Sequence, residues 1–142
     1  MTLIARTVSI NALPDKVWKI ITDVERWPEW ATYMKRLEPQ GEATLGLGSL
    51  VKVTPKGLPG SIWEVTEFDS ARSYTWVTSL APGLRMTGGH VVEPEGAGAR
   101  VTFSLEVSGP VGALVGPLLA VVFRRNTRLA TEGLKAYCEQ ST

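Results

Sequence analysis

The chain has 142 residues, of which 44% are hydrophobic and 20% are charged. Its 15 lysines and arginines against 14 aspartates and glutamates give a formal net charge of +1 at pH 7. This length and composition predict one globular domain over residues 1–142 and exclude a disordered or fibrous chain. The small net charge argues against a nucleic-acid partner, whose binding surface is normally strongly basic.

The cysteine content and the apolar stretches bear on the expected cellular localisation. Cys138 is the single cysteine, so no internal disulfide can form, and a reducing cytoplasm fits best. The first ten residues lack the long apolar core of a secretory signal. The longest apolar stretch, residues 111–123, is shorter than the roughly 20 residues that cross a bilayer. We therefore expect a cytoplasmic protein without stable membrane insertion.

The first elements are predicted from residue spacing. Residues 2–11 alternate in the way of a strand with one buried face. Apolar residues at helical spacing then predict a short helix from Pro14 to Thr22, with proline in its first turn. Asp23 is expected to cap a second short helix that carries Trp27 and Trp30.

The stretch "DVERWPEW" holds two tryptophans on either side of Pro28. Because proline restricts the residue before it to non-helical backbone, we interpret this stretch as a bend between short helices. Trp30 is expected to seal one end of the sheet, and Trp27 is expected to lie toward the surface.

Residues 35–107 change to short runs rich in valine, threonine and aromatic residues, separated by turns rich in glycine, proline and aspartate. This pattern predicts six antiparallel strands, which with the first make seven. After residue 110, apolar residues such as Leu114, Leu118, Val122 and Leu134 recur at helical spacing, which predicts one amphipathic helix of about 30 residues. Pro117 should kink it.

An antiparallel sheet with one apolar face needs a cover, and the terminal helix is the only predicted element long enough. The order strand, two short helices, six strands and long helix therefore predicts an α+β fold. In this fold a curved seven-stranded antiparallel sheet wraps around a long C-terminal helix. Such an arrangement can leave a cavity between the sheet and the helix.

Two segments resemble a known superfamily. They are "VSINALPDKVWKIITDVERWPEW" from Val8 to Trp30 and "GGHVVEPEGAGARVTFSLEV" from Gly88 to Val107. Together with the element order they resemble the helix-grip superfamily of StAR-related lipid-transfer domains and birch-pollen-allergen-like proteins. Within it the chain is most similar to the bacterial polyketide cyclase/dehydrase and lipid-transport group. The resemblance implies a pocket for a hydrophobic ligand but does not specify the ligand or a reaction, because this fold hosts many functions.

No familiar catalytic or metal-binding motif occurs, and His90 is the only histidine. We therefore expect no metal and no cofactor. If the strand face of Met86 and Val92 lines a cavity, His90 is a polar group in an apolar pocket and could move a proton. The alternative, which we favour, is a histidine on the outer face or hydrogen-bonded near the hairpin end.

Strand alternation also selects the aromatic residues that should point inward. Tyr74 and Trp76 share one face of their strand, Trp63 alternates with a solvated Glu64, and Phe103 lies on the apolar face of the last strand. Core packing and pocket wall are partly the same surface in this architecture. The candidate pocket comprises Trp30, Tyr33, Trp63, Tyr74, Trp76, Met86, His90, Phe103, Leu119 and Phe123.

Arg124, Arg125 and Arg128 follow Phe123 in the terminal helix. A spacing of four residues places Arg124 and Arg128 on one face. They could contact an anionic headgroup or a membrane surface, but a solvent-exposed helix face is the simpler interpretation.

Two functional hypotheses remain. The first is binding or transport of a small hydrophobic molecule such as a lipid, a quinone or a polyketide-like aromatic. The alternative is an aromatase/cyclase-like enzyme in which His90 and Tyr74 act as acid and base, since orientation and one or two such groups suffice for that chemistry. The absence of a catalytic set favours the non-enzymatic carrier, and a homodimer stays possible.

Overall fold

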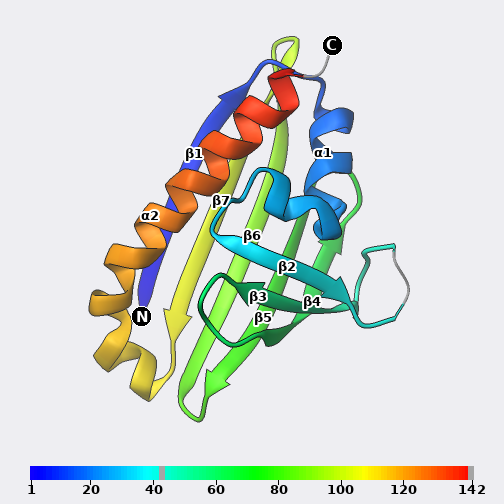
Figure 1. The fold of residues 1–142 in the computed structure, drawn as a ribbon. Coiled ribbons are helices and arrows are strands. Elements are labelled where there is room, and N and C mark those ends of the chain that lie inside the picture. The colour runs from blue at the N-terminus through cyan, green and yellow to red at the C-terminus, as the bar shows by residue number, and fades with distance from the viewer. Residues whose placement is uncertain (42–43, 141–142) are drawn as a thin grey trace.

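The computed structural model describes residues 1–41 and 44–140. It confirms the helix-grip arrangement: a curled, seven-stranded antiparallel sheet with a long C-terminal helix along it (Figure 1). The elements follow in the order β1 (Thr2–Ile10), α1 (Pro14–Thr22), the 3-10 helix η1 (Val24–Glu29), β2 (Met34–Pro39), β3 (Leu50–Pro55), β4 (Ser61–Asp69), β5 (Ser73–Ala81), β6 (Leu84–Glu95), β7 (Gly98–Ser108) and α2 (Pro110–Gln140).

The sheet has the order β1-β7-β6-β5-β4-β3-β2. Strands β2 to β7 form a meander. The last strand, β7, pairs on its other side with the first strand, β1, over the whole length of β1. Helix α2 packs mainly on β1 and β7, while α1 and η1 cover the neighbouring part of the same face (Figure 1). The core therefore lies between the concave face of the sheet and these three helices.

The side of α2 that faces the sheet differs from the one that apolar spacing suggests. Its buried residues are mostly small: Gly112, Gly116, Ala120, Thr127, Ala130, Thr131, Leu134 and Cys138. Leu114 and Leu118 instead point away from the sheet and are 79% and 77% exposed. In the first half of α2, small residues let the helix backbone approach the strands closely, and a Cβ at Gly116 would already collide with Thr2. The helix continues through Pro117 without a break.

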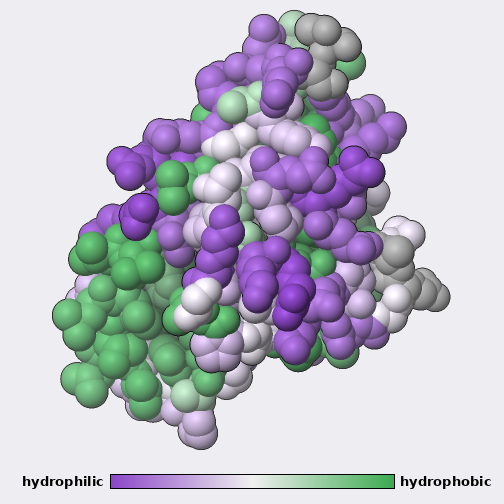
Figure 2. Space-filling model, in the orientation of Figure 1, coloured by the Kyte–Doolittle hydropathy of each residue, from purple (hydrophilic) through white to green (hydrophobic). Residues whose placement is uncertain are grey.

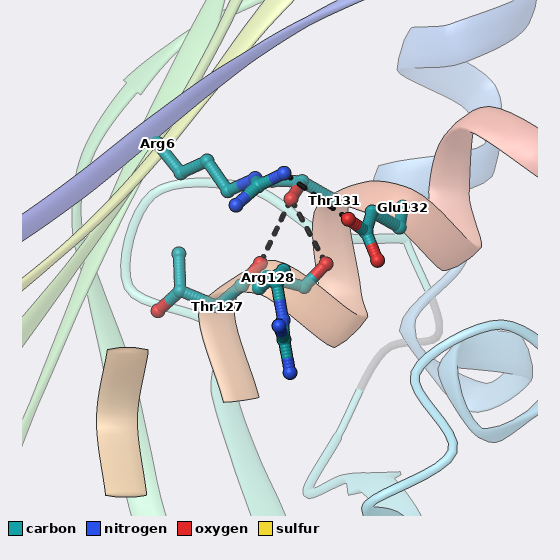
Figure 3. Close-up of polar contacts among 5 residues, drawn as sticks. All are labelled: Arg6, Thr127, Arg128, Thr131 and Glu132. Atoms are coloured by element: carbon teal, nitrogen blue, oxygen red, sulfur yellow. Dashed lines mark hydrogen bonds and ion pairs between the residues drawn. The ribbon is translucent and has the colours of Figure 1, made fainter. Parts of the chain in front are cut away.

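Polar contacts fix α2 along β1. The Arg6 guanidinium on β1 forms an ion pair with the Glu132 carboxylate at 3.1 Å, and the buried Thr131 hydroxyl donates to the carbonyl oxygens of Thr127 and Arg128 at 2.9 and 3.1 Å (Figure 3). Thr131 therefore satisfies its hydroxyl within its own helix. The exposed ion pair joins α2 to β1 but contributes little energy.

Gly133 marks a place where the backbone of α2 lies close to the residue after η1, Trp30. A Cβ at position 133 would collide with the backbone carbonyl of Trp30, whereas one at Gly112 would meet Val107 at 3.4 Å, an ordinary contact distance. We therefore expect Gly133→Ala to lower the free energy of unfolding by about 1 to 3 kcal/mol, the usual cost of overpacking. Urea unfolding of the two variants measures the difference.

The matched control is Gly112→Ala, which should be neutral or stabilise by about 0.5 to 1 kcal/mol through the higher helix propensity of alanine. Equal stabilities of the two variants would show that the contact between Gly133 and Trp30 is not tight.

The bend at "DVERWPEW" differs from expectation in the cap, in the extent of the second helix and in the position of Trp27. Residues 24–29 form a 3-10 helix after Asp23, whose side chain makes no capping hydrogen bond, and Trp30 follows the helix end. Trp30 is buried as expected, but Trp27 is buried as well, each with 3% of its surface exposed. The prediction that Trp27 lies toward the surface is wrong. In the 3-10 helix its ring turns toward the sheet, and its Nε1 donates to the carbonyl of Ile21 at 3.0 Å.

Candidate ligand-binding site

Aromatic rings fill the centre of the concave face. His90 on β6 stacks on Tyr74 of β5 with ring centroids 4.2 Å apart, and Phe103 of β7 meets its edge at 5.1 Å. Trp76 and Trp27 contact the same imidazole from two further sides, at 5.3 and 5.5 Å. Side chains from three adjacent strands and η1 thus meet around one histidine.

His90 lies on the inner face of β6, with Met86 and Val92, and is 5% exposed. Its Nδ1 lies 3.1 Å from the carbonyl oxygen of Tyr74, so this nitrogen carries the proton and donates it. Burial disfavours the charged imidazolium and lowers the pKa of His90 from 6.5 to about 4, although the hydrogen bond to Tyr74 opposes this shift. At neutral pH the ring is therefore an uncharged part of the core.

Tyr74 is fully buried, and its hydroxyl donates to the carbonyl of Ile21 at 2.8 Å. Burial raises the pKa of the Tyr74 phenol well above its ordinary value, because the phenolate would lose its hydration. The carbonyl of Ile21 also accepts a hydrogen bond from Nε1 of Trp27. Both predicted acid-base groups thus donate to backbone carbonyls.

The other candidate pocket residues surround this cluster. Trp63 and Met86 are buried on the inner face of the sheet, and Trp63 Nε1 donates to the Ser61 hydroxyl at 3.0 Å. Partly buried members lie toward the edge of the core: Tyr33, Leu119 and Phe123. Burial raises the pKa of the Tyr33 phenol above its ordinary value.

Trp30 carries an unsatisfied polar atom inside the core. Its ring lies against Trp27 at 4.9 Å and Phe103 at 6.2 Å. Among the described residues, no acceptor lies within hydrogen-bonding distance of its buried Nε1. A buried donor without an acceptor costs about 1 to 3 kcal/mol.

Leu105 is a residue of this region that the sequence pattern did not single out for the pocket. It lies on the inner face of β7 between the buried Phe103 and Val107, yet it is only partly buried. Its neighbour on β6 is Gly88, which has no side chain to cover it. Leu119 and Phe123 of α2 are also only partly buried, so the apolar lining is incompletely covered here.

Two hollows lie elsewhere on the described part of the chain. One has a volume of about 420 Å³ and is lined by Lys16, Ile20, Tyr137 and Gln140. The other, about 330 Å³, lies at the β2–β3 connection and is lined by residues between 40 and 50. Neither is lined by a candidate pocket residue.

Within residues 1–41 and 44–140, no group of three or more histidine, cysteine, aspartate or glutamate side chains is placed to hold a metal ion. No helix in these ranges is long and apolar enough to cross a membrane.

The sheet order and the long C-terminal helix define a helix-grip fold with aromatic side chains on its concave face. The family model for polyketide cyclase/dehydrase and lipid transport matches residues 1–139. The chain belongs to this family.

The chain is similar to one named protein in sequence and to solved structures in fold. A protein named a toxin in Mycobacterium tuberculosis is 26% identical over 125 residues, covering 86% of this chain and 85% of that protein. A START superfamily protein from Mycobacterium smegmatis has a TM-score of 0.77 at 16% identity, with 99% of both chains covered. A di-domain aromatase/cyclase from the steffimycin biosynthetic pathway has a TM-score of 0.76 at 15% identity; the match covers 97% of this chain and 50% of that one.

Proposed function

We propose that this protein binds or carries a small hydrophobic molecule between the inner face of the sheet and α2. The observation that carries the proposal is the buried Nε1 of Trp30, which has no acceptor among the described residues. It lies in an aromatic core against which the partly buried Leu105, Leu119 and Phe123 also pack. Membership of a family described by lipid transport supports the same function.

The site favours a particular ligand chemistry. Aromatic and aliphatic side chains suit a flat or extended apolar body. The Trp30 N–H adds one donor, which a carbonyl or hydroxyl oxygen can accept. A lipid, a quinone or a polyketide-like aromatic meets both conditions. To reach Trp30, such a molecule has to displace partly buried side chains at the edge of the core.

Bound ligand is tested directly by native mass spectrometry after gentle purification, with organic extraction of the sample. We expect a co-purified lipophile, or a raised melting temperature with members of a lipophile panel. No bound molecule and no thermal shift with any panel member would refute the proposal.

The Trp30 anchor makes a sharper prediction. Trp30→Phe removes the N–H but keeps an aromatic ring, so it should lower the preference for fluorenone over fluorene by about five- to tenfold, the loss of one hydrogen bond. These probes differ in the carbonyl oxygen. Thermal stability should fall little, because the unsatisfied donor disappears with the lost ring atoms. Fluorescence titration measures the two affinities.

Trp63→Phe is the matched control, because the Trp63 N–H already donates to Ser61. It should cost stability and leave the preference for fluorenone unchanged. If Trp30→Phe binds both probes with an unchanged preference, the Trp30 N–H does not anchor the ligand. The proposal that the protein binds a hydrophobic ligand would still stand.

The alternative, an aromatase/cyclase-like enzyme using His90 and Tyr74, is less well supported. The Tyr74 hydroxyl and the His90 Nδ1 both donate to backbone carbonyls within the core. A catalytic acid or base has to reach the proton that it moves. The catalytic role stays a prediction, tested by turnover of a poly-β-ketone mimic in wild type and His90→Gln.

A further inference from the structure

The first half of α2 exposes an unusual number of large apolar side chains. Leu114 and Leu118 are 79% and 77% exposed, and Val121 and Val122 are 69% and 52% exposed. Figure 2 shows the result as a continuous apolar surface over the first turns of α2, at the lower left of the molecule. We call these four residues and Val111 the α2 apolar face. Contiguous exposed apolar surface on a small domain marks a binding surface.

The structure holds this face rigidly. The backbone N–H groups of Val111 and Gly112 donate to the carbonyl of Gly83 at 2.9 and 3.2 Å. The β5–β6 hairpin is thereby tied to the first turn of α2 (Figure 1). On the opposite side of the helix, Gly116 lies directly against Thr2 of β1. The exposed side chains are therefore presented on a fixed, convex helix rather than in a groove.

Positive charge borders the α2 apolar face at one end. Arg124, Arg125 and Arg128 follow it directly, and all three are exposed. Between Glu106 and Glu132 the chain has no acidic residue. None of the three arginines forms an ion pair with a carboxylate of the described residues, and Figure 3 shows the Arg128 side chain directed away from Glu132.

This combination fits one partner better than the others. A convex apolar helix face next to unpaired arginines matches an anionic lipid surface, where apolar side chains enter the acyl boundary and arginines meet the phosphates. A second copy of the chain fits poorly. A two-fold axis at the centre of the face would place the arginines of one copy against the apolar start of the other helix, with no carboxylate in residues 107–131 to pair with them.

We propose that the α2 apolar face docks the protein on anionic membrane surfaces, with Leu114 and Leu118 inserted and Arg124 and Arg125 at the headgroups. The docking is peripheral, since α2 stays packed on the sheet. It does not depend on the identity of any ligand. In the docked protein, the α2 apolar face is the part of the molecule nearest the bilayer, so an apolar ligand that leaves the bilayer would contact this face first.

The test is flotation with vesicles of equimolar phosphatidylcholine and phosphatidylglycerol, compared with vesicles of phosphatidylcholine alone. Wild type should float with the anionic vesicles only. Leu114→Gln/Leu118→Gln and Arg124→Gln/Arg125→Gln should each weaken this binding by about tenfold or more. Raised salt should weaken it as well. The substituted side chains are exposed, so both double variants should keep the wild-type melting temperature.

Two control variants match these changes elsewhere on the surface. Leu47→Gln removes a leucine that is 72% exposed in the connection between β2 and β3. Lys19→Gln/Arg72→Gln removes two positive charges at exposed positions on α1 and in the β4–β5 turn. Both controls should float like wild type. Equal losses in the controls would mean unspecific attraction to charge or apolar surface, and would overturn the proposal.

Insertion itself can be followed with a single label. Cys138 is the only native cysteine and is 1% exposed, so Leu118→Cys places one accessible thiol on the α2 apolar face. An environment-sensitive fluorophore there should shift to the blue with anionic vesicles, while the same label on Leu47→Cys should not.

Three further outcomes would overturn docking on lipid. The first is no flotation of wild type with either vesicle. The second is a label at position 118 that stays in water while the protein floats. The third is a wild-type dimer in light scattering that becomes a monomer in Leu114→Gln/Leu118→Gln without any vesicle binding, which would assign the face to a second copy.

Discussion

Trp27→Ala should lower the free energy of unfolding by about 3 to 5 kcal/mol, the cost of emptying a large buried aromatic site. The indole contacts Trp30, Trp76, His90 and Phe103 at centroid distances between 4.9 and 6.1 Å. Its Nε1 also donates to a buried carbonyl. The variant therefore loses apolar burial, ring contacts and a hydrogen bond together. Urea unfolding followed by circular dichroism measures the loss.

Trp18→Ala is the matched control for this variant. Trp18 lies on α1 and is only partly buried, with edge contacts to Phe68 and Tyr74 at 5.7 and 6.0 Å. Its removal leaves a more accessible site, so the expected loss is smaller. If Trp27→Ala were no more destabilising than Trp18→Ala, the central position of Trp27 in the core would be contradicted.

Acidification should destabilise the protein through His90. The pKa of the folded-state imidazole is lowered by burial to about 4, against 6.5 for the exposed group. Between these values the unfolded chain binds a proton that the folded chain does not bind, so the free energy of unfolding falls as the pH falls from 6.5 to 4. The shift corresponds to about 3 kcal/mol at the lower pH, and to almost nothing above pH 7.

His90→Gln isolates this effect, because glutamine does not titrate. Urea unfolding of both proteins at several pH values should show a steeper loss for wild type between pH 6.5 and 4. Carboxylates that titrate in the same range, including Glu139 with its lowered pKa, contribute to both proteins and cancel in the difference. Parallel pH profiles would show that the folded protein accepts the proton on His90.

The fold was accessible from the sequence because strand alternation has a period of two. The prediction that Trp63, Tyr74, Trp76 and Phe103 point inward is confirmed, because all four are buried. Each of these strands has one face toward the core and one toward solvent, and its residues are apolar and polar in the same rhythm. The long terminal helix was equally clear, because no other segment has its length and apolar spacing.

Two features were not accessible, for different physical reasons. The direction of Trp27 depends on the 3-10 geometry of η1, whose three-residue turn rotates side chains differently from an α-helix. The face of α2 that meets the sheet is selected by steric closeness, through Gly112, Gly116 and Ala120. A hydrophobicity pattern ranks leucine above glycine as a core residue, so it points to the wrong side of such a helix.

The carbonyl of Ile21, which accepts hydrogen bonds from both the Tyr74 hydroxyl and the Trp27 Nε1, joins the end of α1 to η1 and β5 as one body. Separating them breaks two buried hydrogen bonds and the aromatic contacts at once. Helix α2 is joined to that body by more superficial bonds, from the Tyr137 hydroxyl to the Glu29 carboxylate at 2.9 Å and from Lys16 to the Cys138 carbonyl at 2.8 Å. Because these two bonds are exposed or only partly buried, water competes with them, and they join α2 to this body less strongly than the two buried bonds join η1 and β5 to α1.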